Sequence, residues 1–209
     1  MLLVVALAGA AVVVVAVAAL PLRSKPGPVS QASGLYRGSE PPVVFRMPGF
    51  SLRDQDGVRI RSRDLRGKAV VLTFLDTQCE ETCPVVAGLV ADGVRALPAE
   101  IRMNVIALAV SADPDEDTPA SVRTFLRHNR AHPELRYLVG PLATLEPLWK
   151  RFQILSSHES GDDEVHSAPV RVYDPRGIWV STLHAGADLT PANLAHDVRL
   201  ALVSTKETE

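Results

Sequence analysis

The chain has 209 residues and a mass of 22.5 kDa, which is enough for one domain with a tail and excludes a large multidomain enzyme. Lys and Arg number 22 against 24 Asp and Glu, so the chain lacks the basic excess that favours nucleic acid as a partner. Its two cysteines are too few for a disulfide-dense scaffold and can act only as one pair.

The N-terminal segment, residues 1–22, contains no charged side chain and consists almost entirely of Val, Ala and Leu. At about 1.5 Å per residue, a helix of this length crosses a hydrocarbon core about 30 Å thick. Ala16-Val17-Ala18 also provides a small-residue cleavage site, so a signal peptide stays open beside the anchor that we favour. Arg23 and Lys25 follow the segment, but two charges carry little weight for orientation. We therefore expect a single N-terminal anchor in the cell membrane, with the soluble domain on the extracytoplasmic side.

The rest of the chain divides into three parts by composition. Residues 23–42 are rich in Pro, Gly and Ser, and this composition predicts a flexible linker. Residues 43–204 are numerous enough to bury about 70% of their unfolded surface and to fold as one domain. Residues 205–209 are expected to form a frayed tail.

Strands are predicted first, in chain order, from the spacing of apolar residues. Residues 50–54 and 58–61 alternate apolar and polar on either side of Asp56-Gly57, which predicts a β-hairpin at the edge of a sheet. Residues 69–75 and 105–110 are continuous apolar runs rich in Val, as in central strands that are covered on both faces.

Helices and further strands alternate through the remainder of the domain. Helical spacing marks residues 84–97, and Thr118-Pro119 and Thr190-Pro191 each provide an N-cap followed by a first helical position. A weaker helical segment, 142–152, contains Pro147. Further strands are predicted at residues 137–139, 170–173 and 179–183, with a turn over 174–177. This order predicts an α/β fold, a sandwich with a mixed central sheet, an N-terminal hairpin and flanking helices.

The cysteines stand in the sequence Cys79-Glu80-Glu81-Thr82-Cys83-Pro84, directly after a predicted central strand and before a helix. Open α/β folds place their functional sites at this end of the sheet. Pro84 predicts that Cys83 is the N-cap of the helix and that Cys79 lies in the loop before it. Both sulfurs would then lie near the positive end of the helix dipole, which favours the thiolate, and a disulfide also stays open.

The two glutamates between the cysteines favour metal binding over nucleophilic catalysis. Two carboxylates oppose thiolate formation by like-charge repulsion unless a cation compensates. Two thiolates are too few for a closed zinc site, and His166, just before a predicted strand, is the best candidate for a third ligand. Two thiolates and one imidazole suit copper, particularly Cu(I). Buried core cysteines remain the simpler alternative.

Two other polar groups have simpler interpretations. His128 and His132 have the spacing of a helical metal pair, but Pro133 and the neighbouring arginines favour a solvated helix end. The acidic run 113–117 is interpreted as a solvated loop before the Thr118 cap, and it lacks the spaced ligands of an EF-hand.

Several motifs occur together in an order that is typical of one family. They are FSLRDQDG at 50–57, DLRGK at 64–68, TQCEETCP at 77–84, SADPDEDTP at 111–119, and VHS at 165–167 followed by YDPRG at 173–177. Together they resemble the Sco/SenC family of membrane-anchored, thioredoxin-fold copper proteins that assist cytochrome c oxidase assembly.

The resemblance implies a thioredoxin-like fold and a copper ion, Cu(I) or Cu(II), bound by Cys79, Cys83 and His166. It implies a membrane-anchored copper-binding chaperone that delivers copper to a cytochrome c oxidase subunit, or primes the redox state of that subunit. The expected partners are thus a copper-receiving oxidase subunit and the membrane, without nucleic acid.

Two departures from the family pattern favour an alternative. Glu80 stands where the family usually has Pro, and Pro169, directly before a strand, is closer to the cis-Pro of thioredoxin-like dithiol reductases. The alternative function is an extracytoplasmic thiol-disulfide oxidoreductase in which Cys79 attacks and Cys83 resolves. A non-metallated sensor or scaffold is a third, weaker alternative.

Overall fold

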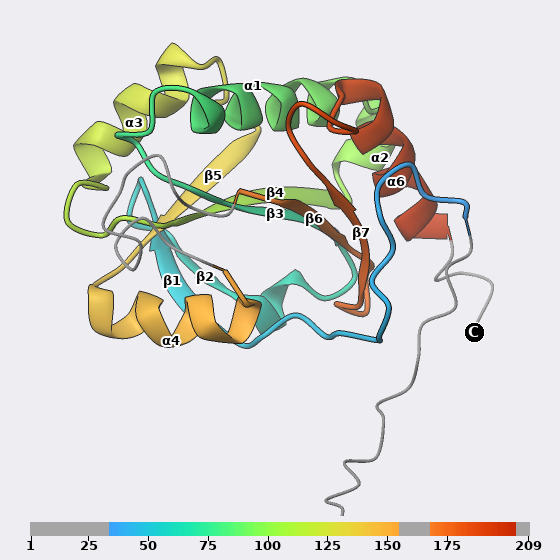
Figure 1. Ribbon diagram of the computed structural model, residues 1–209, viewed down its shortest axis with the longest axis horizontal. Coiled ribbons are helices and arrows are strands. Elements are labelled where there is room, and N and C mark those ends of the chain that lie inside the picture. The colour runs from blue at the N-terminus through green and yellow to red at the C-terminus, as the bar shows by residue number, and fades with distance from the viewer. Residues whose placement is uncertain (1–33, 155–167, 204–209) are drawn as a thin grey trace, which may run out of the picture.

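One mixed seven-stranded sheet organises the protein, in a computed structural model that describes residues 34–154 and 168–203 (Figure 1). The strand order is β2-β1-β5-β4-β3-β6-β7, with β3, β4 and β5 parallel and the outer pairs antiparallel. This arrangement confirms the predicted mixed sheet with a hairpin at one edge. The strands are β1 (Ser51–Asp54), β2 (Arg59–Arg61), β3 (Ala69–Leu75), β4 (Val105–Ser111), β5 (Leu135–Val139), β6 (Val170–Tyr173) and β7 (Trp179–Leu183).

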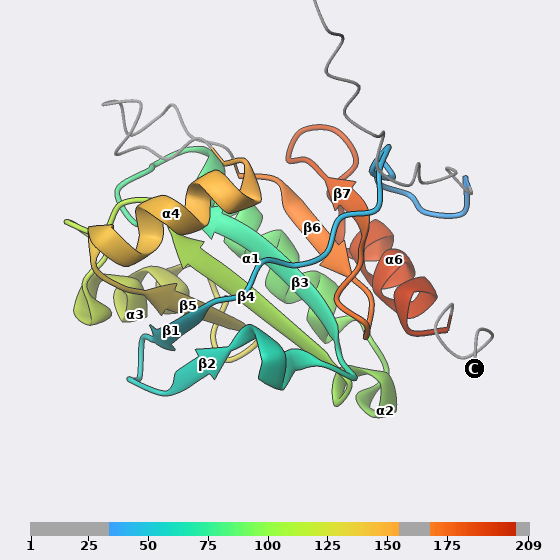
Figure 2. The same ribbon diagram turned by 90° about the horizontal axis from the view of Figure 1, so that it is seen from below.

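Helices cover both faces of this sheet. Figures 1 and 2 show α1, α3 and α6 on one face and α4 on the other. The helices are α1 (Thr82–Arg95), α2 (Ala99–Arg102), α3 (Pro119–His128), α4 (Leu142–Phe152) and α6 (Pro191–Val203), with a short 3-10 helix, η1 (Ser62–Leu65), after β2. The α/β sandwich expected from the sequence is thereby confirmed.

The central strand β3 shows why a continuous apolar run was the right signal. Val70 and Leu72 belong to the core on the α4 side, together with the fully buried Trp149. Val71 and Leu75 belong to the core on the side of α1 and α6. Every residue of β3 is buried, because the strand has a helical layer on each face.

The structure contains the predicted hairpin turn and the two predicted N-caps. Gly57 has a positive φ of 79° in the β1–β2 hairpin. The Thr118 hydroxyl accepts the amide of Ser121 at 3.2 Å, and the Thr190 hydroxyl accepts that of Asn193 at 3.1 Å. The predicted segment 142–152 forms α4, which begins after Pro141 and contains Pro147 in its interior.

Part of the predicted linker is attached to the domain, which corrects the expectation for residues 34–42. The amides of Arg37 and Gly38 donate to the buried carboxylate of Asp197 at 2.8 and 3.0 Å. Ser39 exchanges two backbone hydrogen bonds with Thr182 at 2.8 and 2.9 Å, so the segment covers the edge of β7 (Figure 1). Composition failed here because backbone hydrogen bonds to Asp197 and Thr182, with Tyr36 packed against the core, fix a segment that has few apolar side chains.

The predicted anchor and the C-terminal tail both lie outside the described residues. Within residues 34–154 and 168–203, no helix has the length and apolar character needed to cross a membrane.

Candidate metal centre

The two cysteines lie in the loop between β3 and α1 and in the first turn of that helix. Helix α1 begins at Thr82 with Glu81 as its N-cap, so Cys83 is the second helical residue. The prediction of Cys83 as N-cap was therefore wrong. Pro84 fits within the first turn because amides there have no intrahelical acceptor to lose.

The sulfur atoms of the two cysteines face each other without a disulfide. Neither cysteine takes part in a disulfide, and the Cys83 thiol forms a hydrogen bond with the Cys79 sulfur. The Cys83 amide also donates to Cys79 Sγ at 3.4 Å, and the Asp76 amide donates to Cys83 Sγ at 3.4 Å. Cys83 is fully buried, whereas Cys79 retains 3% of its surface. The loop thus holds two adjacent sulfur ligands, with Cys79 nearer the surface and Cys83 beneath it.

Hydrogen bonding separates the acidities of the two sulfurs. The Cys83 thiol lowers the pKa of Cys79 to about 6, and the amides of Cys83, Thr82 and Glu81 lower it further against the opposing effect of burial. The pKa of Cys83 is raised, first because its proton is held by Cys79 and then because it is buried. At neutral pH the pair therefore holds one proton between two sulfurs.

The prediction that the two glutamates of the loop oppose thiolate formation was wrong for Cys79. Glu80 and Glu81 are both exposed, and neither carboxylate is among the main causes of the lowered Cys79 pKa. The backbone amides at the start of α1 prevail because they lie within hydrogen-bonding distance of the sulfur, while water screens the carboxylates.

The buried carboxylate of Asp117, which the sequence did not reveal as a site residue, is hydrogen-bonded to the start of the cysteine loop. Asp117 accepts the amide of Thr77 at 3.0 Å, and the hydroxyl of Tyr137 lies 2.7 Å from the same carboxylate. The Tyr137 hydroxyl also lies 2.6 Å from the carbonyl oxygen of Leu75 at the end of β3. Asp117 is 3% exposed, so the interpretation of its acidic run as a solvated loop was wrong for this residue. Its position in the quoted SADPDEDTP motif was the available signal.

Cys79 also forms part of the wall of a cavity of about 670 Å³ between the cysteine loop and α3. Gln78 and Glu80 line it from the loop, and His128 and Asn129 line it from the end of α3. His132 lines a different cavity, with Glu134, so these two histidines do not share one cavity. The exposed positions of both fit the predicted solvated helix end.

The predicted third ligand, His166, lies outside the described residues. Within the part of the chain that the structure describes, no group of three His, Cys, Asp or Glu side chains could hold a metal ion. The next described residues, Ala168 and Pro169, line one cavity together with Thr82, the residue before Cys83. The chain thus re-enters the described structure close to the start of α1.

The peptide bond before Pro169 is trans, which corrects the cis-Pro comparison. Within residues 34–154 and 168–203, the cis peptide bond is at His132-Pro133. The alternative function loses the support that a cis-Pro169 would have provided.

Comparison with known proteins places this geometry in a family. The model of the SCO1/SenC family matches residues 43–202. The chain belongs to the SCO1/SenC family. Its thioredoxin-like α/β fold is that of an SCO1/SenC protein, as the sequence motifs indicated.

Individual SCO1/SenC proteins are related to the chain over most of its length. The SCO1 protein homolog of Bacillus subtilis is 25% identical over 165 residues, covering 77% of this chain and 84% of the relative. Bradyrhizobium japonicum ScoI, solved with copper bound, is 26% identical with a TM-score of 0.65, covering 76% of this chain and all of that one. BsSco, solved in a study of its disulfide switch, shares the fold at 24% identity with a TM-score of 0.62, covering 75% and 93% of the two chains.

Proposed function

We propose that this SCO1/SenC protein binds one copper ion through Cys79, Cys83 and His166 and delivers it to a subunit of cytochrome c oxidase. Residues 1–22 would anchor it in the membrane, with the domain on the extracytoplasmic side. The observation that carries the proposal is the pair of facing, reduced sulfurs, of which the outer one reaches a cavity wall.

The donors present fit copper. Two cysteine sulfurs are soft ligands, and soft ligands with an imidazole select copper over the hard cations that prefer oxygen. The lowered pKa of Cys79 supplies one ligand already deprotonated at neutral pH, as metal binding requires. His166 precedes Ala168 closely in sequence, and Ala168 shares a cavity with Thr82 beside Cys83. This neighbourhood supports His166 as the third ligand.

The family relatives support both the cargo and the partner. ScoI of Bradyrhizobium japonicum has been solved with copper bound. BsSco is described as a member of the Sco family of cytochrome c oxidase assembly proteins. We infer that this chain has the same cargo and the same kind of acceptor.

Copper affinity measured on variants tests the ligand set. The reduced domain is titrated with Cu(I) in competition with a chromophoric chelator, for the wild type and for Cys79→Ser, Cys83→Ser and His166→Ala. Loss of a ligand is expected to weaken binding on the order of tenfold or more, because even changes beyond the ligands have effects of that size. Transfer is then followed to a purified copper-binding oxidase fragment.

Two other histidines provide matched controls for His166. His158→Ala removes a histidine from the same stretch of sequence, and His128→Ala removes one that lines the cavity beside Cys79. Both variants are expected to bind Cu(I) as the wild type does. A His166→Ala variant with wild-type affinity would remove His166 from the ligand set, and a loss confined to His128→Ala would place the third ligand on α3.

A second candidate function is thiol-disulfide exchange, which the lowered pKa of Cys79 favours. In that reaction the Cys79 thiolate attacks a partner disulfide and releases one partner thiolate. Cys83 then loses its proton, attacks the Cys79 sulfur of the mixed disulfide and releases the second thiolate. Two electrons pass to the partner and the chain ends as a Cys79–Cys83 disulfide. Fast exchange by a His166→Ala variant that has lost copper binding would establish this activity separately.

A further inference from the structure

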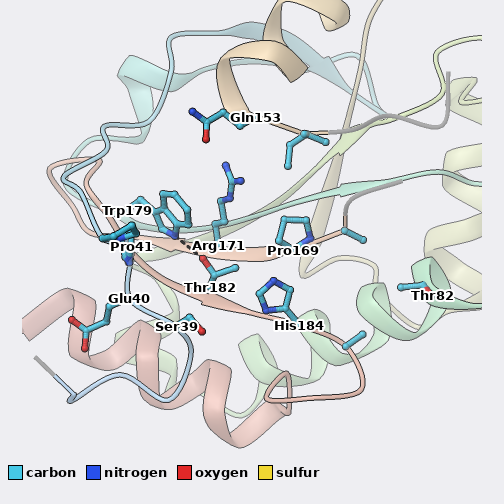
Figure 3. Close-up of a pocket in the computed structure, with 14 residues that line it drawn as sticks. Ser39, Glu40, Pro41, Thr82, Gln153, Pro169, Arg171, Trp179, Thr182 and His184 are labelled. Atoms are coloured by element: carbon cyan, nitrogen blue, oxygen red, sulfur yellow. Dashed lines mark hydrogen bonds between the residues drawn. The ribbon is translucent and has the colours of Figure 1, made fainter. Parts of the chain in front are cut away.

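A second cavity, of about 560 Å³, is lined by other residues than the cavity beside Cys79 and contains a buried cation (Figure 3). Its volume lies in the range of sites for small ligands, about 300–1,000 Å³. The N-terminal segment that covers β7 forms one wall, and the end of α4 with the start of β6 forms another. None of these residues belongs to the cysteine loop except Thr82 at its end.

Arg171, on β6, is the cation in this cavity. Its side chain is only 7% exposed, and its guanidinium lies 4.5 Å from the ring centroid of Trp179. Nη1 donates to the carbonyl oxygen of Phe152 at 2.7 Å, while the buried Nε has no hydrogen-bond partner among the described residues. No carboxylate within the described residues forms an ion pair with Arg171.

This arrangement is costly unless an anion completes it. A buried charge is stabilised by an opposite charge or by full hydrogen bonding, and one carbonyl oxygen and one ring face supply only part of that. The carboxylate that lines the cavity, Glu40, accepts the amide of Gly34 at 2.8 Å and points away from Arg171 in Figure 3. The positive charge of Arg171 therefore faces the cavity without a counter-charge from the wall residues that the structure describes.

The walls around Arg171 define the kind of anion that fits. Trp179 is fixed by donating its indole N–H to Ser181 and Thr182, at 3.0 and 2.9 Å, so its ring holds the guanidinium from one side. Pro41 and Pro169 supply apolar surface, and the lining as a whole is more apolar than polar. A guanidinium held by its face presents its edge, and that edge binds a planar carboxylate through two parallel hydrogen bonds.

We propose that this cavity is a binding site for a carboxylate carried on an apolar body, with Arg171 as its anchor and Trp179 as its platform. The carboxylate comes either from a free organic acid or from an acidic side chain of a peptide. Neither Cys79 nor Cys83 is among the described residues that line the cavity, so the site is distinct from the cysteine pair.

The two tryptophans of the chain allow a direct test by NMR of the ¹⁵N-labelled protein at pH 7. Phenylacetate is titrated while the two indole N–H signals are followed. The Trp179 signal is expected to shift in a saturable way, and the signal of Trp149, which belongs to α4 and is buried in the core, is expected to stay unchanged. Phenylacetamide, of the same shape without the charge, should bind at least tenfold more weakly.

Variants of two arginines provide the matched comparison. Arg171→Met removes the charge and keeps much of the side-chain length, and should weaken phenylacetate binding at least tenfold. Arg171→Lys keeps the charge without the planar fork and should bind with intermediate affinity. Arg151→Gln, an exposed arginine on α4, should bind as the wild type does. The comparison of acid with amide uses the wild-type chain, so it stands even if an Arg171 variant fails to fold.

A terminally blocked Ala-Glu-Ala peptide distinguishes the two sources of the carboxylate. Tighter binding of the peptide than of phenylacetate assigns the site to acidic protein segments, and the reverse assigns it to free acids. Equal affinity for phenylacetate and phenylacetamide, or no shift of Trp179 with any probe, would overturn the proposal.

Discussion

The proton shared by Cys79 and Cys83 gives the most direct test of the cysteine geometry. The pKa of Cys79 is lowered from 9.0 to about 6, with the Cys83 thiol as the largest cause, whereas the pKa of Cys83 is raised. At pH 7 roughly nine-tenths of Cys79 should therefore be thiolate, against about one hundredth for an ordinary thiol. Replacing Cys83 by Ala removes the donor, so the pKa of Cys79 should rise by more than one pH unit.

Thiolate absorbance near 240 nm, followed from pH 4 to 10 on reduced, metal-free protein, measures this directly. It is preferable to alkylation, because Cys79 is only 3% exposed and a reagent would report access as well as charge. The wild type should show a single rise with a midpoint of about 6 and the amplitude of one thiolate. Cys83→Ser retains a hydrogen-bond donor and should give a midpoint between those of the wild type and Cys83→Ala. A wild-type midpoint above 8, or an amplitude of two thiolates, would refute the shared proton.

Three further predictions concern the scaffold around the site. Burial raises the pKa of Asp117 to about 6, so the folded state binds its proton more tightly and this group makes the protein less stable as pH rises from about 4 to about 6. Asp117→Asn should flatten that slope in urea unfolding, and an unchanged slope would contradict the assignment. Leu72→Ala should lower the free energy of unfolding by about 2–5 kcal/mol in the same assay, because Leu72 is fully buried in the central strand. Gly38→Ala would place a Cβ against the carbonyl oxygen of Thr182 and should lower the free energy of unfolding by about 1–3 kcal/mol. The control Gly49→Ala, whose Cβ would have no heavy atom nearer than 4.0 Å, should lower it by less than about 1 kcal/mol. Equal losses for the two variants would contradict the close packing at Gly38.

Periodic signals predicted the scaffold because they report burial along a single element. Residues 69–75 are apolar except for Thr73, and β3 has the same bounds, since each face of the strand meets its own layer of side chains. The capping signal of Thr118 worked for the same reason, because its acceptor and donor lie within one helical turn.

Signals that depend on distant partners failed or were unavailable. Asp117 looked like part of a solvated acidic run, but its burial depends on Thr77 and Tyr137, which are separated from it by 40 and 20 residues. Arg171 was predicted correctly within a strand, yet nothing local shows that its charge is buried against Trp179. The position of Cys83 was wrong because Pro84 restricts the preceding residue only statistically, and the loop places the start of α1 two residues earlier than predicted.

The depth of the two cysteines explains how one site can support both candidate functions. A partner that approaches through the cavity beside α3 meets Cys79, because Cys83 is fully buried behind it. Cys79 is also the sulfur with the lowered pKa, so the accessible atom and the reactive atom are the same. Copper exchange and disulfide exchange both begin with a new bond at a thiolate, and both would begin at Cys79. What separates them is a third donor that holds the metal, which makes His166 the residue on which the proposed function of this chain depends.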